Sequence, residues 1–141
     1  MRFWDASALV PLLTSEPEYQ GVGALLREDD SVALWWGTHV ECLSAIWRKM
    51  RARDMEGLQF RSAVQVLGAI EAEALIIQPR PPVRDRAGQL LGNHALVAGD
   101  AFQLAAALDW AGGKPTGLAF VSLDRRLREA ALKEGFQVLP E

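Results

Sequence analysis

The sequence has very little cysteine and histidine. Cys42 is the only cysteine among 141 residues, so no disulfide can form within the chain, and a reducing compartment suits it. We interpret Cys42 as a small apolar residue buried on a helix. The two histidines, His39 and His94, lie in unrelated contexts with no cysteine nearby, which argues against a zinc site. A Ser-His-Asp triad is also disfavoured, because Ser7 has no partnered histidine.

Long apolar runs and phosphate-binding loops are missing as well. No stretch is apolar over the roughly 20 residues that a bilayer-spanning helix needs. The chain opens on residues 1–4 with the pattern of a strand and shows no signal peptide. We therefore expect a cytoplasmic protein with no membrane partner. No glycine-rich loop of the P-loop or dinucleotide-binding type is present.

The sequence also lacks a strong excess of either charge. The formal net charge is −3, which at first argues against a nucleic-acid partner. Without the four acidic residues considered below, fourteen anions face fifteen cations. Three basic groups, each more typical of a solvated helix face than of a phosphate track, are Arg48, Lys49, Arg51 and Arg53; Arg80, Arg84 and Arg86; and Arg125, Arg126 and Arg128. The charge pattern permits RNA binding without demonstrating it.

The composition is that of a folded chain. Half of the residues are apolar and 23% are charged, and 141 residues are enough to bury a core, so we expect a single domain over residues 1–141. We expect strands over residues 2 to 4 or 5, 31–35, 75–77, 118–122 and 136–139. We expect helices over 7–14, 17–28, 38–53, 55–74, 83–91, 100–110 and 124–134, with Val40, Leu43, Trp47 and Met50 forming the stripe of helix 38–53. Continuous apolar strands separated by helices predict a parallel sheet in a three-layer α/β/α fold.

Four acidic residues lie where predicted helices begin: Asp5, Glu41, Asp100 and Asp124. In a parallel sheet, ligands bind beyond the carboxyl ends of the strands, where the strand order reverses. We therefore expect these side chains to meet at one edge of the sheet. Carboxylates that lack a counter-charge repel one another, so a divalent cation is their natural partner. Ligation by oxygen alone favours Mg²⁺ or Mn²⁺.

Each acid also has a purely structural explanation as a helix cap. Thr38-x-x-Glu41 and Asp100-x-x-Gln103 have the spacing of a capping box, and Asp124 can be the N-cap of the last helix. This explanation is weakest for Asp5, because a carboxylate that ends a buried strand must be paired, hydrated or bound to metal. The two roles are compatible, since helix N-termini stabilise carboxylates.

Several segments have a pattern that is known from one protein family. They are FWDASALV at residues 3–10, Glu41, GDAFQLAAA at 99–107, FVSLDRRL at 120–127, Ala130-Ala131 and GFQVL at 135–139. With these segments in this order, the whole chain resembles the PIN-domain family, and within it the VapC-like toxins of bacterial toxin–antitoxin pairs.

The resemblance implies a PIN-like five-stranded parallel sheet and an endoribonuclease with an acidic pocket that holds one or two Mg²⁺ or Mn²⁺ ions. The residues that match the acidic positions of the family are Asp5, Glu41, Asp100 and Asp124. Ser7 matches the small hydroxyl residue beside the first acid, and Ser122 a position that usually holds Thr or Ser. Gln103 departs from the pattern, because a histidine is common there and glutamine cannot titrate.

From these residues we hypothesise a metal-dependent hydrolysis of RNA. The cation would lower the pKa of a water, whose hydroxide attacks the phosphorus in line and leaves 5′-phosphate and 3′-hydroxyl ends. Asp5 and Asp100 would be direct ligands, and Glu41 and Asp124 would bind directly or through water. Ser7 would position the water or a phosphate oxygen.

The resemblance also implies partners. A VapB-like antitoxin would place an amphipathic segment in an apolar groove, and the chain would form a homodimer. We expect that groove between residues 55–67 and the leucine-rich early helices, which contain Leu9, Val10, Leu12, Leu13, Leu25 and Leu26. For Trp36 we weigh stacking on an RNA base against the more usual core packing or protein contact of an indole.

Two other functions stay open at this point. One is a catalytically inactive PIN-like module that binds RNA or protein without turnover. The other is an α/β phosphotransfer domain with Asp5 as its nucleophile. The second is disfavoured, because the aspartate expected two residues later is Ser7.

Overall fold

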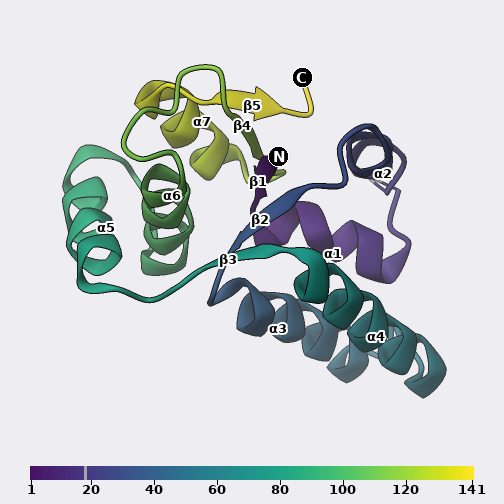
Figure 1. Cartoon of the computed structure of the whole chain (residues 1–141). Helices are drawn as coiled ribbons and strands as arrows, with labels where there is room; N and C mark the ends of the chain where they lie inside the picture. Colours follow the sequence, from purple (N-terminus) through teal and green to yellow (C-terminus); the bar gives the residue numbers. More distant parts are fainter. Residues whose placement is uncertain (18) are drawn as a thin grey trace.

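Five short parallel strands form the centre of the structure, a computed structural model that describes residues 1–17 and 19–141 (Figure 1). The strands are β1 (Arg2–Trp4), β2 (Val32–Trp35), β3 (Leu75–Ile77), β4 (Ala119–Val121) and β5 (Gln137–Leu139). They pair in the order β3-β2-β1-β4-β5, and every pair is parallel. The strand order reverses beside β1, because the chain first builds outward through β2 and β3 and then returns to add β4 and β5.

Both faces of the sheet are buried. Phe3 and Trp4 are adjacent in β1, and both are fully buried although successive side chains of a strand point to opposite faces. All four residues of β2 are buried as well. Burial on both faces explains why the strands are continuous apolar runs, and the predicted five-stranded parallel α/β fold is confirmed.

Two layers of helices cover the sheet. One layer contains α1 (Ala6–Thr14), α2 (Tyr19–Glu28), α3 (Thr38–Arg51) and α4 (Gly57–Glu73), and the other contains α5 (Pro81–Asn93), α6 (Ala98–Trp110) and α7 (Arg125–Glu134). Figure 1 shows α5, α6 and α7 gathered on one side and α1, α3 and α4 on the other. Two core clusters match this division: Trp4 and Leu34 pack with the first layer, and Phe3 and Ala33 pack with the second.

The predicted helices are present, with shifted starts. α2 begins at Tyr19, so Pro17 lies in the turn before it, and Glu18 is outside the described residues. α6 begins at Ala98, two residues earlier than predicted, and Val97 is its N-cap. In the described part of the chain, no helix combines the length and the apolar character that a membrane crossing requires.

The buried face of α3 differs from the predicted one. Val40 and Trp47 were expected in an inward stripe, but they are 64% and 47% exposed. The residues that face the core are Thr38, Cys42 and Ile46, which are spaced four apart. Of the predicted stripe, Leu43 and Met50 are partly buried against the same core, so the buried face is rotated from the predicted one. The interpretation of Cys42 as a buried helical residue is confirmed.

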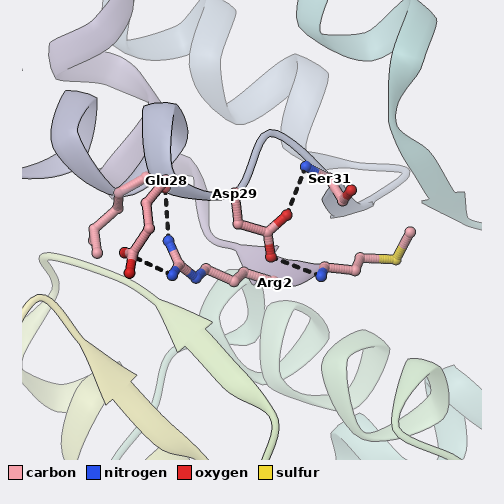
Figure 2. A network of polar contacts seen from close by, with 6 residues as sticks. Arg2, Glu28, Asp29 and Ser31 are labelled. Atoms are coloured by element: carbon pink, nitrogen blue, oxygen red, sulfur yellow. Dashed lines mark hydrogen bonds and ion pairs between the residues drawn. The ribbon is translucent and has the colours of Figure 1, made fainter.

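Ion pairs hold the amino-terminal edge of β1. Figure 2 shows Arg2, Glu28 and Asp29 meeting at this edge. The Arg2 guanidinium donates to Glu28 Oε2 at 2.8 Å and to the backbone oxygen of Leu25 at 2.6 Å. The amino-terminal ammonium donates to Asp29 Oδ2 at 2.7 Å. These contacts tie the start of the central strand to the end of α2.

Arg2 should contribute more to stability than its ion pair with Glu28 alone suggests. The Arg2→Met variant loses the charged hydrogen bond to the Leu25 carbonyl, so we expect the free energy of unfolding to fall by about 1.5–3 kcal/mol. The Glu28→Gln variant changes only a largely exposed partner, and we expect a loss below about 1 kcal/mol. Urea unfolding of both variants measures the difference, and equal losses would contradict the structural role given to Arg2.

Candidate functional site

The carboxyl ends of β1 and β4 bring two of the predicted acids together. Asp5 directly follows β1 and is the N-cap of α1, and its backbone N–H donates to the Val121 oxygen of β4 at 2.9 Å. Asp124 follows β4 and is the N-cap of α7, as predicted. Because β1 and β4 are neighbours at the point where the strand order reverses, both acids lie where parallel sheets bind ligands.

Asp5 is buried and held by two serines. Its side chain is 3% exposed, and its Oδ2 accepts hydrogen bonds from the Ser7 hydroxyl, from the Ser7 backbone N–H at 3.2 Å and from the Ser122 hydroxyl at 2.9 Å. No hydrogen bond from the described residues reaches Oδ1. One oxygen of Asp5 is therefore fixed by the protein, and the other keeps its lone pairs for a ligand.

Ser7 also connects the ends of two strands. Its Oγ accepts hydrogen bonds from the backbone N–H groups of Leu123 at 2.8 Å and Asp124 at 3.1 Å. The Ser122 hydroxyl lies 3.3 Å from Ser7 Oγ. With three such contacts, the Ser7 hydroxyl is committed to holding the loop after β4 in place, and it orients Asp5.

Glu41 is positioned by a contact between α3 and α6. Gln103, which is fully buried, donates through Nε2 to Glu41 Oε1 at 3.3 Å and to Thr38 Oγ1 at 3.0 Å. With its nitrogen facing Glu41, the Gln103 amide donates to a carboxylate that accepts when it is ionised. The predicted capping box of Thr38 and Glu41 is wrong: Gly37 is the N-cap of α3, and it makes no side-chain cap.

Asp100 lies at the third position of α6, so the prediction of Asp100 as an N-cap with Gln103 as its capping-box partner is also wrong. Partial burial and the charge of Asp124 raise the pKa of Asp100, while the Val97 N–H and Arg126 lower it. The influence of Asp124 shows that the start of α6 lies near the start of α7. All four predicted acids therefore contribute to one electrostatic cluster.

Burial and mutual repulsion disfavour charge on these acids. Burial, offset in part by the two serines and reinforced by Asp100, raises the pKa of Asp5 to about 6. Burial and then the charge of Asp5 raise the pKa of Glu41 to about 7. Within residues 1–17 and 19–141, no lysine, arginine or histidine forms an ion pair with Asp5, Glu41, Asp100 or Asp124.

The donor set of this cluster fits a hard divalent cation. It consists of carboxylate oxygens without a nitrogen or sulfur donor, which is the chemistry that Mg²⁺ and Mn²⁺ prefer. Among the described residues, no three His, Cys, Asp or Glu side chains already have the spacing of a coordination shell. Asp100 nevertheless acts electrostatically on Asp5 and Glu41, and Asp124 acts on Asp100, so each acid lies within electrostatic range of at least one other. Rotation of exposed parts of these side chains would be needed to bring more oxygens together.

The remaining histidines and one arginine have local roles. His39 Nδ1 contacts Glu71 at 3.0 Å, and His94 Nε2 contacts Glu134 at 2.8 Å, so each histidine makes a local hydrogen bond to a glutamate. Arg128, whose basic group was interpreted as a solvated helix face, donates to the backbone oxygens of Ser122, Leu139 and Pro140 at the ends of β4 and β5.

The predicted apolar groove is largely filled. Leu9 and Leu13 of α1 are buried and belong to the same core cluster as Ala63 and Leu67 of α4. The prediction assumed that the early helices leave their leucines exposed, but α1 packs directly against α4. A cavity of about 330 Å³ remains at the end of α1, and it is lined by Leu13, Thr14, Ser15, Lys49, Asp54, Met55, Leu58, Gln59 and Ser62.

Sequence reasoning missed two features of the site. It did not connect Gln103 and Thr38 with Glu41, because nothing in their spacing shows that α3 and α6 meet. It also favoured packing for Trp36, which is 55% exposed beside the start of α3. An indole directly after a strand, followed by Gly37, was the only signal for that exposure.

Two curated relatives match almost the whole chain. They are Ribonuclease VapC45 and Ribonuclease VapC49 from Mycobacterium tuberculosis (strains CDC 1551 / Oshkosh and ATCC 25618 / H37Rv), and each is 32% identical over 138 residues. The match covers 98% of this chain and 94% of each relative. No family model matches the chain.

Solved structures share the fold. FitAcB from Neisseria gonorrhoeae matches with a TM-score of 0.67 at 18% identity, covering 99% of this chain and 97% of that chain. PAE2754 from Pyrobaculum aerophilum matches with a TM-score of 0.65 at 20% identity, covering 98% and 88%. FitAB bound to an IR36 DNA fragment matches with a TM-score of 0.65 at 17% identity, covering 99% and 94%. At these identities the likeness concerns the fold.

Glu41 should make the metal-free protein less stable as the pH rises. Its pKa is about 7 in the folded state and near 4.5 when unfolded, so the folded state keeps a proton that the unfolded state has lost. The stability that this proton provides is present at pH 4 and is lost as the pH rises through 7. In EDTA we expect Glu41→Gln to melt within about 1 °C of the parent protein at pH 4.5 and roughly 3–8 °C above it at pH 8.

Glu129→Gln is the matched control, because Glu129 is exposed and pairs with Arg125 on α7. Its melting temperature should follow that of the parent protein across the same pH range. If the melting temperature of Glu41→Gln also equals that of the parent protein at every pH, the raised pKa of Glu41 is contradicted.

Proposed function

Because the chain belongs to the VapC family of ribonuclease toxins, we propose that it is a metal-dependent endoribonuclease that acts as the toxin of a toxin–antitoxin pair. The proposal names Asp5, Glu41, Asp100 and Asp124 as the metal-binding and catalytic acids, with Mg²⁺ or Mn²⁺ as the cation. Ser7 belongs to the same site as a positioning residue.

The observation that supports the proposal is the buried carboxylate of Asp5 among other acids. Burial raises its pKa to about 6, and the charge of Asp100 adds to that effect. A protein gains nothing in stability from such an arrangement, since carboxylates that are buried without a cation disfavour the folded state at neutral pH. A bound divalent cation would reverse this effect on stability, because it favours the ionised form of each acid around it.

Each acid has an oxygen that the protein leaves available. Hydrogen bonds converge on Asp5 Oδ2 and spare Oδ1. Asp124 uses Oδ1 to cap α7 by accepting from the Leu127 N–H at 2.8 Å, so its Oδ2 stays free. Gln103 holds Oε1 of Glu41, and no hydrogen bond from the described residues reaches Oε2. When bound, a divalent cation would supply Lewis acidity, which lowers the pKa of a water and offsets charge on a phosphodiester.

The protein groups around the cation would orient the reaction. Ser7 and Ser122 orient Asp5 through their hydroxyls, and Ser7 Oγ also holds the backbone of Leu123 and Asp124. Gln103 ties Glu41 to α6 and so couples the starts of α3 and α6. Hydrolysis in such a frame forms a bond from water oxygen to phosphorus and breaks the bond to the 3′-oxygen, leaving 5′-phosphate and 3′-hydroxyl ends.

The proposed partners are single-stranded or looped RNA, a VapB-like antitoxin and a second copy of the chain. The antitoxin is proposed from membership of the toxin family, and one neighbour of this fold, FitAB, is described as bound to an IR36 DNA fragment. The cavity of about 330 Å³ at the end of α1 has a mainly polar lining around Leu13, Met55 and Leu58, and we propose it as a docking point for the antitoxin segment.

The Asp5→Asn variant should lose RNA cleavage while keeping its fold. Asparagine preserves the shape of the side chain and removes the charge, so we expect at least a 1,000-fold fall in the cleavage rate of a structured RNA with Mn²⁺. The increase in melting temperature that Mn²⁺ gives the parent protein should also disappear. Gel analysis of a labelled RNA and thermal melts with and without Mn²⁺ measure both effects.

Glu129→Gln removes one exposed carboxylate far from the site and should leave both measurements unchanged. Cleavage by Asp5→Asn at the parental rate would refute the assignment of the site. If the parent protein binds RNA and Mn²⁺ without cleaving, it is instead a binding module of the same family.

A further inference from the structure

Trp36 is an exposed tryptophan just before α3, the helix that contains Glu41. It follows β2 and is 55% exposed, although its backbone N–H is fixed by a hydrogen bond to the Ile77 oxygen at 3.0 Å. Its ring meets that of Trp35 edge to face, with centroids 6.5 Å apart. The indole is thus held in place by its neighbours while much of its surface faces solvent.

A cavity of about 430 Å³ lies against Trp36. Its volume falls within the range of about 300–1,000 Å³ that small-molecule sites occupy. Aromatic rings, prolines and arginines dominate its lining, which consists of Trp35, Trp36, Gly37, Pro79, Arg80, Pro81, Arg84 and Phe102. Trp35 and Phe102 stack at 5.5 Å with nearly parallel planes and form a rigid wall.

Gly37 is needed for this wall. A Cβ atom at position 37 would lie 3.0 Å from Cδ1 of Trp35 and closer still to its ring nitrogen. Because Gly37 has an ordinary negative φ, it serves here to make room for the indole and not to allow an unusual backbone. The small residue at the start of α3 therefore lets Trp35 pack flat behind the cavity.

The walls of the cavity are also the elements that position the acids. Gly37 is the N-cap of α3, the helix that contains Glu41, and Phe102 lies in the first turns of α6 between Asp100 and Gln103. Gln103 joins the two helices through its hydrogen bond to Glu41. The cavity and the acidic cluster therefore lie on adjoining parts of one sheet edge.

The charge around the cavity suits a phosphate chain. Arg84 is 72% exposed and contacts only its neighbour Asp85, at 3.3 Å, among the described residues. Arg80 is held by Asp109 at 2.6 Å, which keeps its guanidinium plane beside the cavity. The cavity on the other side of Trp36 contains Glu71 and His39, and an acid there disfavours a phosphate. The arginine-lined side is the one that complements RNA.

We propose that the cavity between Trp36 and Arg84 binds one unpaired base of the RNA substrate next to the scissile phosphate. The base would stack on Trp36 against the wall of Trp35 and Phe102, while Arg84 neutralises a neighbouring phosphate. Stacking tolerates every base, so this site favours single-stranded over paired RNA without selecting a sequence. The identity of the substrate rests on the proposed function.

The test compares Trp36→Ala and Trp36→Phe in the Asp5→Asn background, where RNA stays intact. The probe is a fluorescein-labelled, unstructured 12-nucleotide RNA, and its affinity is measured by fluorescence anisotropy with Mg²⁺. We expect Trp36→Ala to weaken binding by about 5- to 150-fold, the loss that corresponds to about 1–3 kcal/mol per stacked base. Trp36→Phe should recover part of the affinity, because a phenyl ring still stacks.

Trp47→Ala is the matched control, since Trp47 is also exposed and lies on the outer part of α3 against Phe60. It should bind RNA as tightly as the Asp5→Asn parent. In an abasic series, the RNA from which every base is removed should bind Trp36→Ala and the Asp5→Asn parent equally. Thermal melts establish that each variant is folded.

The outcomes separate this inference from the proposed function. If RNA binds but Trp36→Ala and the abasic series leave the affinity unchanged, the base site is overturned even when the intact protein cleaves RNA. If the intact protein fails to cleave but Trp36→Ala weakens binding as expected, the base site stands and the catalytic proposal fails. If Trp36→Ala changes only self-association, measured by sedimentation, the cavity is a protein interface and the inference is wrong.

Discussion

The burial of one carboxylate at the end of the central strand organises the functional edge of this protein. Asp5 is 3% exposed, and its Oδ2 takes hydrogen bonds from Ser7 and Ser122, which come from either side of the point where the strand order reverses. The same contacts close the loop after β4 onto α1. Burial raises the pKa of Asp5 to about 6, and burial of Glu41, followed by the charge of Asp5, raises the pKa of Glu41. The burial of Asp5 is therefore both part of the fold and a cause of the electrostatics of the site.

Acidic residues at the two edges of the sheet have different kinds of partner. At the amino-terminal edge, Glu28 and Asp29 are satisfied by the Arg2 guanidinium and the amino-terminal ammonium (Figure 2). These contacts hold the strand start against α2, and a hydrogen-bonded ion pair explains the lowered pKa of Asp29. At the carboxyl edge, the acids receive hydroxyl and amide donors but no cationic partner from the described residues. That contrast is what a structural role at one edge and a ligand-binding role at the other would produce.

Much of the fold was predictable because its signals are local. Apolar strands, glycines after helices and the helical spacing of apolar residues identify each element, and a sheet buried on both faces follows from continuous strands. The parallel topology also predicted the places of Asp5 and Asp124 after the neighbouring strands β1 and β4, because these places need no side-chain detail. The role of Asp124 as an N-cap was likewise evident from its place before α7. That residues 1–141 form a single domain stays a prediction.

The features that could not be predicted from the sequence depend on contacts between elements that are distant in the chain. The link from Gln103 to Glu41 needs α3 and α6 to touch across 62 positions, and no periodicity encodes it. The predicted inward face of α3 was wrong. Apolar character favoured Val40 and Trp47, whereas packing on the sheet buries Thr38 and Cys42. The groove was predicted because the leucines of α1 and α4 are apolar in sequence. Their burial against one another depends on how the two helices pack, which the sequence pattern does not show.

The proposed function depends on the four acids forming one site that binds a hard cation. Crystals soaked in Mn²⁺ and measured at the manganese absorption edge test this directly, because anomalous scattering locates the ion without reference to activity. We expect a peak in contact with Asp5 and at least one of Glu41, Asp100 and Asp124. A crystal in which manganese binds only at other surface carboxylates, with this cluster unoccupied at millimolar Mn²⁺ and pH 8, would contradict the central claim.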